Sequence, residues 1–265
     1  MSAAEPAPRP PAPRANLYLE SRYRKLVRGL PQTIFWCPEC KGHGRRRQGC
    51  AKCGGRGKLT DDSVQELIGR ALLPAFRARE GKFHGAGRED IDVRMLGRGR
   101  PFVYELVRAK NFTVDLEALR KRLHAEHGAR IELDPFVAVE RGRVAYWKEA
   151  HFPKVYRALV RTETAVTETQ LEPLRGRTLQ ILQRTPQRVV HRRADLERER
   201  EVTVVAASPL DGAELELVVR CAHGTYVKEW VSGDAGRTKP SLPELLGTPC
   251  VCAELDVLEI LDADS

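Results

Sequence analysis

The chain has 265 residues, enough for one large domain or two small ones with a buried core. Charged residues make up 31% and apolar residues 42%, a composition that excludes a wholly disordered chain. No run of 18 apolar residues occurs and residues 1–14 lack the apolar core of a secretory signal, so we expect neither a membrane span nor secretion. The seven cysteines then favour reduced thiols in the cytoplasm over a disulfide scaffold.

The net charge of +9 is concentrated near the N-terminus. Residues 14–58 hold 12 Lys or Arg against 2 Glu and carry +10, whereas residues 59–265 carry −1. Such a patch suits a polyanionic partner, of which nucleic acid is the first candidate. The alternative is a basic face that is simply solvated.

Residues 1–15 are rich in Ala, Pro and Arg and predict a disordered tail, and residues 16–58 form a basic segment with four cysteines. A helix is expected from Asp61 to about Arg79, with Asp61, Asp62 and Ser63 as candidate caps. Its apolar residues fall at helical spacing: Val64, Leu67, Ile68, Ala71, Leu72 and Phe76.

After a Gly-rich stretch over 81–99, the pattern predicts a strand over 101–109 and a helix over 114–127 capped by Thr113. The following β-like runs cover 130–139, 143–149, 155–164, 177–183, 187–192, 201–207 and 214–221. Short helices are expected around 224–232 and 241–247, before a last strand over 250–262. Many strands without βαβ alternation predict an α+β fold with a largely antiparallel sheet.

Four cysteines follow the pattern C-x2-C-x9-C-x2-C, at Cys37, Cys40, Cys50 and Cys53. Two such turns direct four thiolates at one point, which is typical of a closed tetrahedral zinc site. With four protein ligands the zinc would be structural and not catalytic. Disulfides, an iron–sulfur cluster and unused cysteines are the alternatives. The three remaining cysteines, Cys221, Cys250 and Cys252, lie in apolar runs and are interpreted as buried thiols.

The Gly-rich stretch contains two carboxylates between two arginines, in the order Arg88, Asp90, Asp92 and Arg94. In an extended chain these four side chains would share a face. A surface ladder of ion pairs and a D-x-D metal site are the alternatives to a catalytic role.

The string GREDIDVRMLGRGRPFVYEL resembles archaeal-type tRNA pseudouridine synthases that modify the T-loop at positions 54 and 55. The resemblance extends to SRYRKLVRGLPQT, the cysteine turns, SVQELI, KVYRALV, QRTPQRVVHRR and CAHGTYVKEWVSGDAGRTKPSLPELL, and covers about residues 20–262. Archaeal members carry an additional N-terminal RNA-binding domain, whereas only the Pro/Ala-rich tail precedes the matching region here. The resemblance implies a pseudouridine synthase fold over 59–265, with a mixed sheet, flanking helices and a zinc-knuckle segment at 16–58.

The resemblance also assigns the catalytic residues. Asp90 corresponds to the nucleophile, Lys228 to its basic partner, and Tyr226 to a tyrosine that assists with the C5 proton. If GTYVK is extended, Tyr226 and Lys228 point the same way. Tyr156 corresponds to a tyrosine that stacks on the target base, and Asp92 is expected to order the loop through Arg88 or Arg94. The alternative for each tyrosine is a core residue with a satisfied hydroxyl.

The target uridine lies in a folded loop and must be flipped out, so the protein must also hold the RNA. The residues expected to bind the substrate are Arg88, Lys154, Tyr156, Arg184, Arg192, Arg193, Arg237 and Lys239. The basic N-terminal residues expected to assist are Arg22, Arg24, Lys25, Arg28, Arg45, Arg46 and Arg47.

The sequence therefore predicts a cytoplasmic tRNA pseudouridine synthase with structural zinc, no organic cofactor, no membrane contact and no obligatory protein partner. The first alternative is a non-catalytic zinc-containing RNA-binding or RNA-chaperone protein. Two others are a zinc-knuckle redox module and a D-x-D metal hydrolase, whose activity would be lost in excess chelator.

Overall fold

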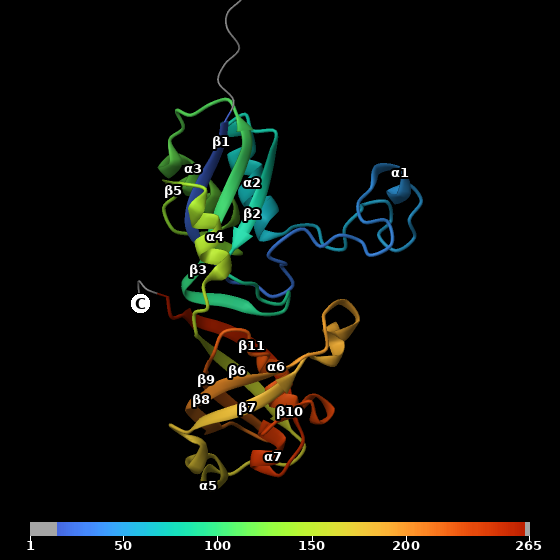
Figure 1. Cartoon of the computed structure of the whole chain (residues 1–265), viewed down its shortest axis with the longest axis vertical. Helices are drawn as coiled ribbons and strands as arrows, with labels where there is room; N and C mark the ends of the chain where they lie inside the picture. Colours follow the sequence, from blue (N-terminus) through green and yellow to red (C-terminus); the bar gives the residue numbers. More distant parts are fainter. Residues whose placement is uncertain (1–14, 263–265) are drawn as a thin grey trace, which may run out of the picture.

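The computed structural model describes residues 15–262, without the side chain of Arg192, and centres on a mixed sheet of 11 strands (Figure 1). Nine strands follow the order β10-β7-β8-β9-β6-β11-β3-β1-β4, while β2 also pairs with β3 and β5 with β1. The strands are β1 (Ala15–Lys25), β2 (Glu80–Gly85), β3 (Arg94–Ala109), β4 (Ile131–Leu133), β5 (Val137–Val139), β6 (Lys154–Thr162), β7 (Thr178–Arg184), β8 (Glu197–Pro209), β9 (Glu214–Cys221), β10 (Thr238–Lys239) and β11 (Cys250–Ile260).

The helices are short and flank this sheet, which confirms the predicted α+β class (Figure 1). The α-helices are α1 (Gly44–Arg47), α2 (Val64–Ala75), α3 (Leu116–His127), α4 (Gly142–Glu149), α5 (Glu168–Leu171), α6 (Val227–Ser232) and α7 (Leu242–Leu246). The 3-10 helices are η1 (Glu172–Leu174), η2 (Gln187–Arg192) and η3 (Asp234–Gly236). None of the helices over residues 15–262 has the length and apolar character that a membrane span requires. The predicted tail lies outside the described residues except for Ala15.

The sheet has two halves that meet at a parallel pair of strands. Strands β1 to β5 form one half with α2, α3 and α4, and β6 to β11 form the other with α5, α6 and α7 (Figure 1). Every strand pair is antiparallel except β11 with β3, which aligns Asp256 with Arg94 and Val257 with Met95. The segment with the four cysteines projects sideways from the first half (Figure 1).

The carboxylate of Asp256 lies at this junction, buried among three arginines. Arg94 binds it through two nitrogens at 2.8 and 2.7 Å, Arg28 at 2.8 Å and Arg157 at 2.9 Å. Burial alone would raise the pKa of Asp256, but these cations lower it to about 2. Since Arg28 follows β1, Arg94 begins β3 and Arg157 lies in β6, one carboxylate connects both halves of the sheet.

Helix α2 follows the predicted pattern closely. Ser63 is its N-cap and accepts a hydrogen bond from the Glu66 amide. All six residues at helical spacing are buried in the main core: Val64, Leu67, Ile68, Ala71, Leu72 and Phe76. Helix α3 also forms, but Asp115 and not Thr113 caps it, accepting from the Ala118 amide.

Two predicted strands are helical in the structure. Residues 143–149 form most of α4, because Val144 and Trp147 lie three positions apart and pack on one side with Val103. The run 187–192 forms the turn η2 after Pro186, whose carbonyl accepts from the amides of Val189 and Val190. In both runs apolar and polar residues alternate irregularly over so few positions that helix and strand patterns coincide.

Residues 16–25 are predicted to belong to the zinc-knuckle segment and Ala15 to the tail, yet residues 15–25 form β1 and pair with β3, β4 and β5. Its inward side chains alternate as Leu19, Ser21, Tyr23 and Lys25, all buried. The polar members of this set mask the two-residue hydrophobic period. The projecting cysteine segment therefore begins after β1.

The bend of β3 near the junction depends on a glycine. Gly97 has φ +57°, and a Cβ atom there would lie 1.9 Å from the backbone oxygen of Leu258 in β11. A carbonyl of a paired strand cannot move aside as a flexible side chain can. Glycine is therefore required where β3 passes from one half of the sheet to the other.

We predict that Gly97→Ala lowers the free energy of unfolding by about 2–5 kcal/mol, because it combines a left-handed backbone with a backbone clash. Chemical denaturation followed by circular dichroism measures this change. Gly142→Ala is the matched control, since nothing lies within 4 Å of its Cβ position, and it should change stability by less than about 1 kcal/mol. Equal stability of the two variants would contradict the prediction.

Candidate active site

The loop between β2 and β3 carries the two central carboxylates in a turn and not in an extended chain. The Val93 amide donates to the Asp90 carbonyl at 3.1 Å, and the Gly29 amide to the Ile91 carbonyl at 2.9 Å. The predicted common face of Arg88, Asp90, Asp92 and Arg94 is therefore wrong. Arg88 is exposed, and Arg94 binds Asp256 at the junction.

A buried ionic network lies beneath this loop. Glu89 is 5% exposed and accepts from the Tyr23 hydroxyl at 2.8 Å and from Arg100 Nε at 2.8 Å. Lys25 Nζ lies 3.7 Å from Glu89 and donates to the carbonyls of Leu30 at 2.8 Å and Asp90 at 3.1 Å. Burial lowers the pKa of Lys25 and raises that of Tyr23. Buried side chains of β1 and β3 thus hold the backbone of the Asp90 loop in place from the protein interior.

The carboxylate of Asp90 faces two cations from the opposite half of the sheet. Arg188 in η2 lies 3.2 Å from it, and Lys228 in α6 lies 3.7 Å from it. The side chain of Asp90 is 40% exposed, so it remains open to a ligand. The structure thus brings the predicted residues Asp90 and Lys228 together.

Lys228 binds Asp92 more closely than it binds Asp90. Its Nζ donates to both carboxylate oxygens of Asp92 at 2.7 Å. Burial would raise the pKa of Asp92, but the bond to Lys228 lowers it overall. The expectation that Asp92 orders the loop through Arg88 or Arg94 is wrong, because Lys228 fills that role and Arg28 binds the Asp92 carbonyl at 2.7 Å.

Arg188 is the residue that sequence reasoning missed. Its Nε binds Glu229, a buried side chain of α6, while its other nitrogens reach Asp90. Short helix α6 therefore presents Lys228 to the loop and Glu229 to Arg188. The available signal was the string QRTPQRVVHRR, in which Arg188 lies two residues after the proline that begins η2.

Tyr226 and Lys228 do not lie in one extended segment, so the condition for their predicted common direction is not met. Tyr226 is the N-cap residue of α6 and Lys228 lies inside that helix. The Tyr226 hydroxyl accepts from Arg193 Nη1 at 2.9 Å. Gln183 holds the Tyr226 backbone, accepting from its amide at 2.7 Å and donating to its carbonyl at 3.0 Å. The pattern of GTYVK is typical of a strand, but the N-cap Tyr226 and the first residues of α6 lie within it.

Tyr156 and Lys154 alternate on β6 and therefore share a face of the sheet. Burial raises the pKa of Tyr156, and the charges of Cys221, Glu89 and Asp90 contribute to the increase. Burial and the charge of Arg100 lower the pKa of Lys154 to about 8. Both predicted residues thus lie on the central strand β6, where Lys154 donates to the Phe152 carbonyl at 2.9 Å.

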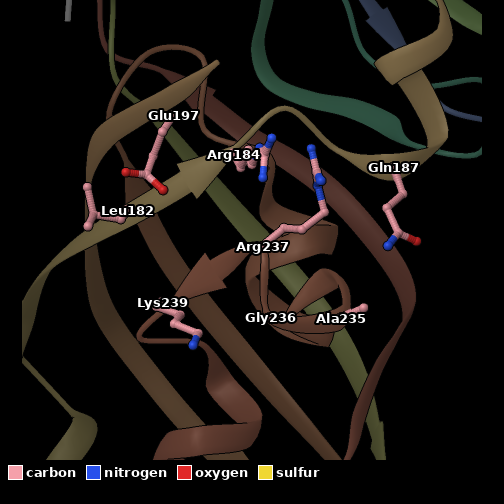
Figure 2. Close-up of a pocket in the computed structure, with 8 residues that line it drawn as sticks. All are labelled: Leu182, Arg184, Gln187, Glu197, Ala235, Gly236, Arg237 and Lys239. Carbon is pink, nitrogen blue, oxygen red and sulfur yellow. The ribbon is translucent and has the colours of Figure 1, made fainter. Parts of the chain in front are cut away.

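Three predicted substrate-binding residues line a separate pocket of about 400 Å³ beside η2 (Figure 2). Arg184 and Arg237 both bind Asp195, and Arg237 also donates to the Thr185 carbonyl at 2.7 Å. Lys239 lies apart from them, exposed and without an ion pair among the described side chains (Figure 2). The pocket is next to the site, because Gln187 lines it and Arg188 follows. The side chain of Arg192 lies outside those described.

The four cysteines of the projecting segment meet as the spacing predicts. Their sulfur atoms all lie within 4.8 Å of one another, with 3.8 Å between Cys37 and Cys50 and 3.7 Å between Cys40 and Cys53. Four sulfurs placed about 2.3 Å from one zinc in a tetrahedron would be about 3.8 Å apart. The donor set therefore fits a tetrahedral metal site. The residues with a described side chain offer no other group of three or more His, Cys, Asp or Glu ligands.

We predict that Glu89→Gln destabilises the protein by about 3–5 kcal/mol, because it leaves Arg100 and Lys25 buried without a counter-charge. Denaturant titration measures the loss. Glu254→Gln is the matched control, because this carboxylate is half-exposed beside Arg28. The substitution should lower the free energy of unfolding by less than about 1 kcal/mol. A Glu89 variant as stable as the Glu254 variant would refute the role given to the network.

Comparison with known proteins gives the family. Residues 18–261 match the family described as "Pus10, C-terminal". The tRNA pseudouridine synthase Pus10 of Methanothrix thermoacetophila is 44% identical over 245 residues, covering 92% of this chain and 53% of the relative. The Pus10 of Methanothermobacter marburgensis is 46% identical over 246 residues, covering 92% and 60%.

Among solved structures, a Cbf5-Nop10-Gar1 complex aligns with a TM-score of 0.40 at 16% identity, over 74% of this chain and 45% of that one. The chain spans about half the length of the first curated relatives it matches. The family match extends from β1 to β11 and includes the cysteine segment, the Asp90 loop, η2 and α6. This chain belongs to the Pus10 C-terminal family.

Proposed function

We propose that this chain carries the catalytic centre of a tRNA pseudouridine synthase, which converts uridine to pseudouridine in the T-loop at position 54, 55 or both. The observation that carries the proposal is the Asp90 carboxylate, open to solvent on one side and flanked by Arg188 and Lys228. In a member of the Pus10 family, this geometry suits a nucleophile whose charge neighbouring cations stabilise.

In the proposed reaction Asp90 attacks C1′ of the ribose or C6 of the uracil, and the bond between C1′ and N1 breaks. The freed base turns, C5 bonds to C1′, and the bond to Asp90 breaks so that the carboxylate is restored. The C5 proton leaves and N1 gains a proton. The atoms balance without an external reagent, so no organic cofactor is needed. Tyr156 would lie against the uracil from β6, and Tyr226 would assist the loss of the C5 proton.

The flipped uridine must be held through its RNA backbone. Residues around the site that would contribute are Arg88, Lys154, Arg184, Arg192, Arg193, Arg237 and Lys239. The internal ion pairs of Arg184 and Arg237 make Lys239 and Arg88, which are exposed, the more available contacts. A tRNA substrate would place the activity in the cytoplasm, and no obligatory protein partner is expected.

We also propose that the cysteine site holds structural zinc on Cys37, Cys40, Cys50 and Cys53. The sulfur separations support zinc, and four protein ligands leave no open coordination position. The metal would stabilise a segment that has few buried apolar side chains of its own, since its small core consists of the thiols and Leu59.

The first test is the nucleophile. Asp90→Asn keeps the shape of the side chain but removes its charge, so pseudouridine formation in an unmodified tRNA transcript should fall by at least ~10³. RNA binding should survive, because phosphate contacts supply most of the affinity. Mapping of pseudouridine in the product, together with a binding titration, measures both.

Asp92→Asn is the matched control for this test. It should reduce the rate less than Asp90→Asn does, since Asp92 acts on the loop through Lys228. Wild-type activity in Asp90→Asn would show that the wrong carboxylate was chosen. Equal loss in both variants, with turnover that depends on added Mg²⁺, would favour a metal-dependent reaction.

The second test is the metal. Elemental analysis should find about one zinc per chain, and Cys37→Ser should lose it and destabilise the cysteine segment. Cys252→Ser, at a partly buried thiol of β11, should keep full zinc content. Full occupancy in a variant lacking both Cys37 and Cys40 would exclude these residues as ligands.

A further inference from the structure

Two adjacent aromatic side chains are exposed on the cysteine lobe, defined here as residues 35–59. Phe35 is 40% exposed and Trp36 is 52% exposed. The other two tryptophans of the chain, Trp147 and Trp230, are 3% and 0% exposed. Trp36 is thus the one tryptophan that a partner can reach. An exposed ring of this size on a projecting lobe suggests a contact surface.

The ring of Trp36 is held in place by the fold of the lobe. Its backbone forms an isolated β-bridge with Lys58, and the Cys37 amide next to it donates to the Gly57 carbonyl at 2.9 Å. A Cβ atom at Gly42 would lie 2.3 Å from the Trp36 ring, so the ring rests directly on the backbone of the first cysteine turn. The glycine allows this contact and leaves about half of the side chain open.

Several basic side chains of the same lobe lack ion-pair partners among the described residues. Lys41, Arg45, Arg46, Arg47 and Lys52 are exposed and form no ion pair with any described residue. Glu39 is the one acidic residue of the lobe, against seven Lys or Arg. Even with −2 from four thiolates on one zinc, the lobe stays strongly positive. These cations are free to bind an anion.

We propose that Trp36 stacks on an unpaired nucleobase of the tRNA while the arginines of α1 bind the adjacent phosphates. The inference rests on the proposed function, which supplies RNA as the partner, and adds a second contact outside the Asp90 site. A fixed flat ring on the same small lobe as exposed guanidinium groups complements an unpaired nucleotide, which presents a base face and a phosphate together. A paired duplex hides its base faces and offers phosphates alone.

Intrinsic fluorescence tests the proposal directly, because Trp36 is the exposed tryptophan. Titration of the full chain with an unmodified tRNA transcript should quench this emission in a saturable way, and a fully paired RNA duplex of equal length should not. Trp36→Phe should abolish the quenching by tRNA and keep affinity within a few fold. Quenching by the duplex as strong as by tRNA would overturn base stacking.

Trp36→Phe and Trp36→Leu form a matched pair, since both can cover Gly42 but only one retains a ring. Removal of the ring should weaken tRNA binding about 5- to 100-fold, with zinc content unchanged. The salt dependence should keep its slope in Trp36→Leu, because stacking releases no counterions. Equal affinity of the Phe and Leu variants would overturn the proposal, as would a Leu variant that binds like wild type.

Two controls separate this contact from charge and from the reaction. Reversal of Arg45, Arg46 and Arg47 to Glu should lower both affinity and the salt slope, whereas Phe112→Ala, at another exposed aromatic residue, should change neither. Pseudouridine formation by the wild type is measured on the same transcript. If it proceeds while Trp36→Leu binds normally, only this inference fails; if it is absent while tRNA quenches Trp36, only the proposed reaction fails.

Discussion

A single buried carboxylate, Asp256, sets the geometry on which the site depends. It forms ion pairs with Arg28, Arg94 and Arg157 where β11 and β3 align in two residue pairs. Asp90 belongs to one half, whereas Arg188 and Lys228 belong to the other. A shift of the halves by a few ångströms would separate the carboxylate from both cations. The ion cluster at the junction therefore helps to hold the Asp90 loop opposite Arg188 and Lys228.

A second buried carboxylate, that of Glu89, holds the Asp90 loop in place from the protein interior. Glu89 precedes Asp90 in the chain but points into the protein, where Arg100 and Tyr23 bind it. Adjacent residues of this turn thus have opposite environments. The Glu89 side chain is buried and hydrogen-bonded, whereas the Asp90 side chain is partly exposed and forms ion pairs. This arrangement fixes the loop from the protein interior while the Asp90 side chain stays 40% exposed.

The sequence predicted best what depends on local spacing. Helix α2 with its Ser63 cap and the four converging cysteines follow from patterns within about 20 residues. Strand β1 and the partner of Asp92 did not follow, because Lys25 and Lys228 each bind residues more than 60 positions away. Arg188 was missed for the same reason. Its neighbours in the string are equally basic, and only the tertiary contact with Asp90 and Glu229 distinguishes it.

Lys228 and Arg188 both face Asp90, but each also binds a second carboxylate, and these second carboxylates differ. Lys228 binds Asp92 through both carboxylate oxygens and approaches Asp90 from the same position. Arg188 divides its nitrogens between Asp90 and the buried Glu229. If Asp90 bonded covalently to a ribose or a base, both cations would still retain an anionic partner. Neither would then be left as an uncompensated charge, which is the costly outcome at a partly buried site. Asp92 and Glu229 thus allow Asp90 to change its charge while the loop, η2 and α6 stay in place.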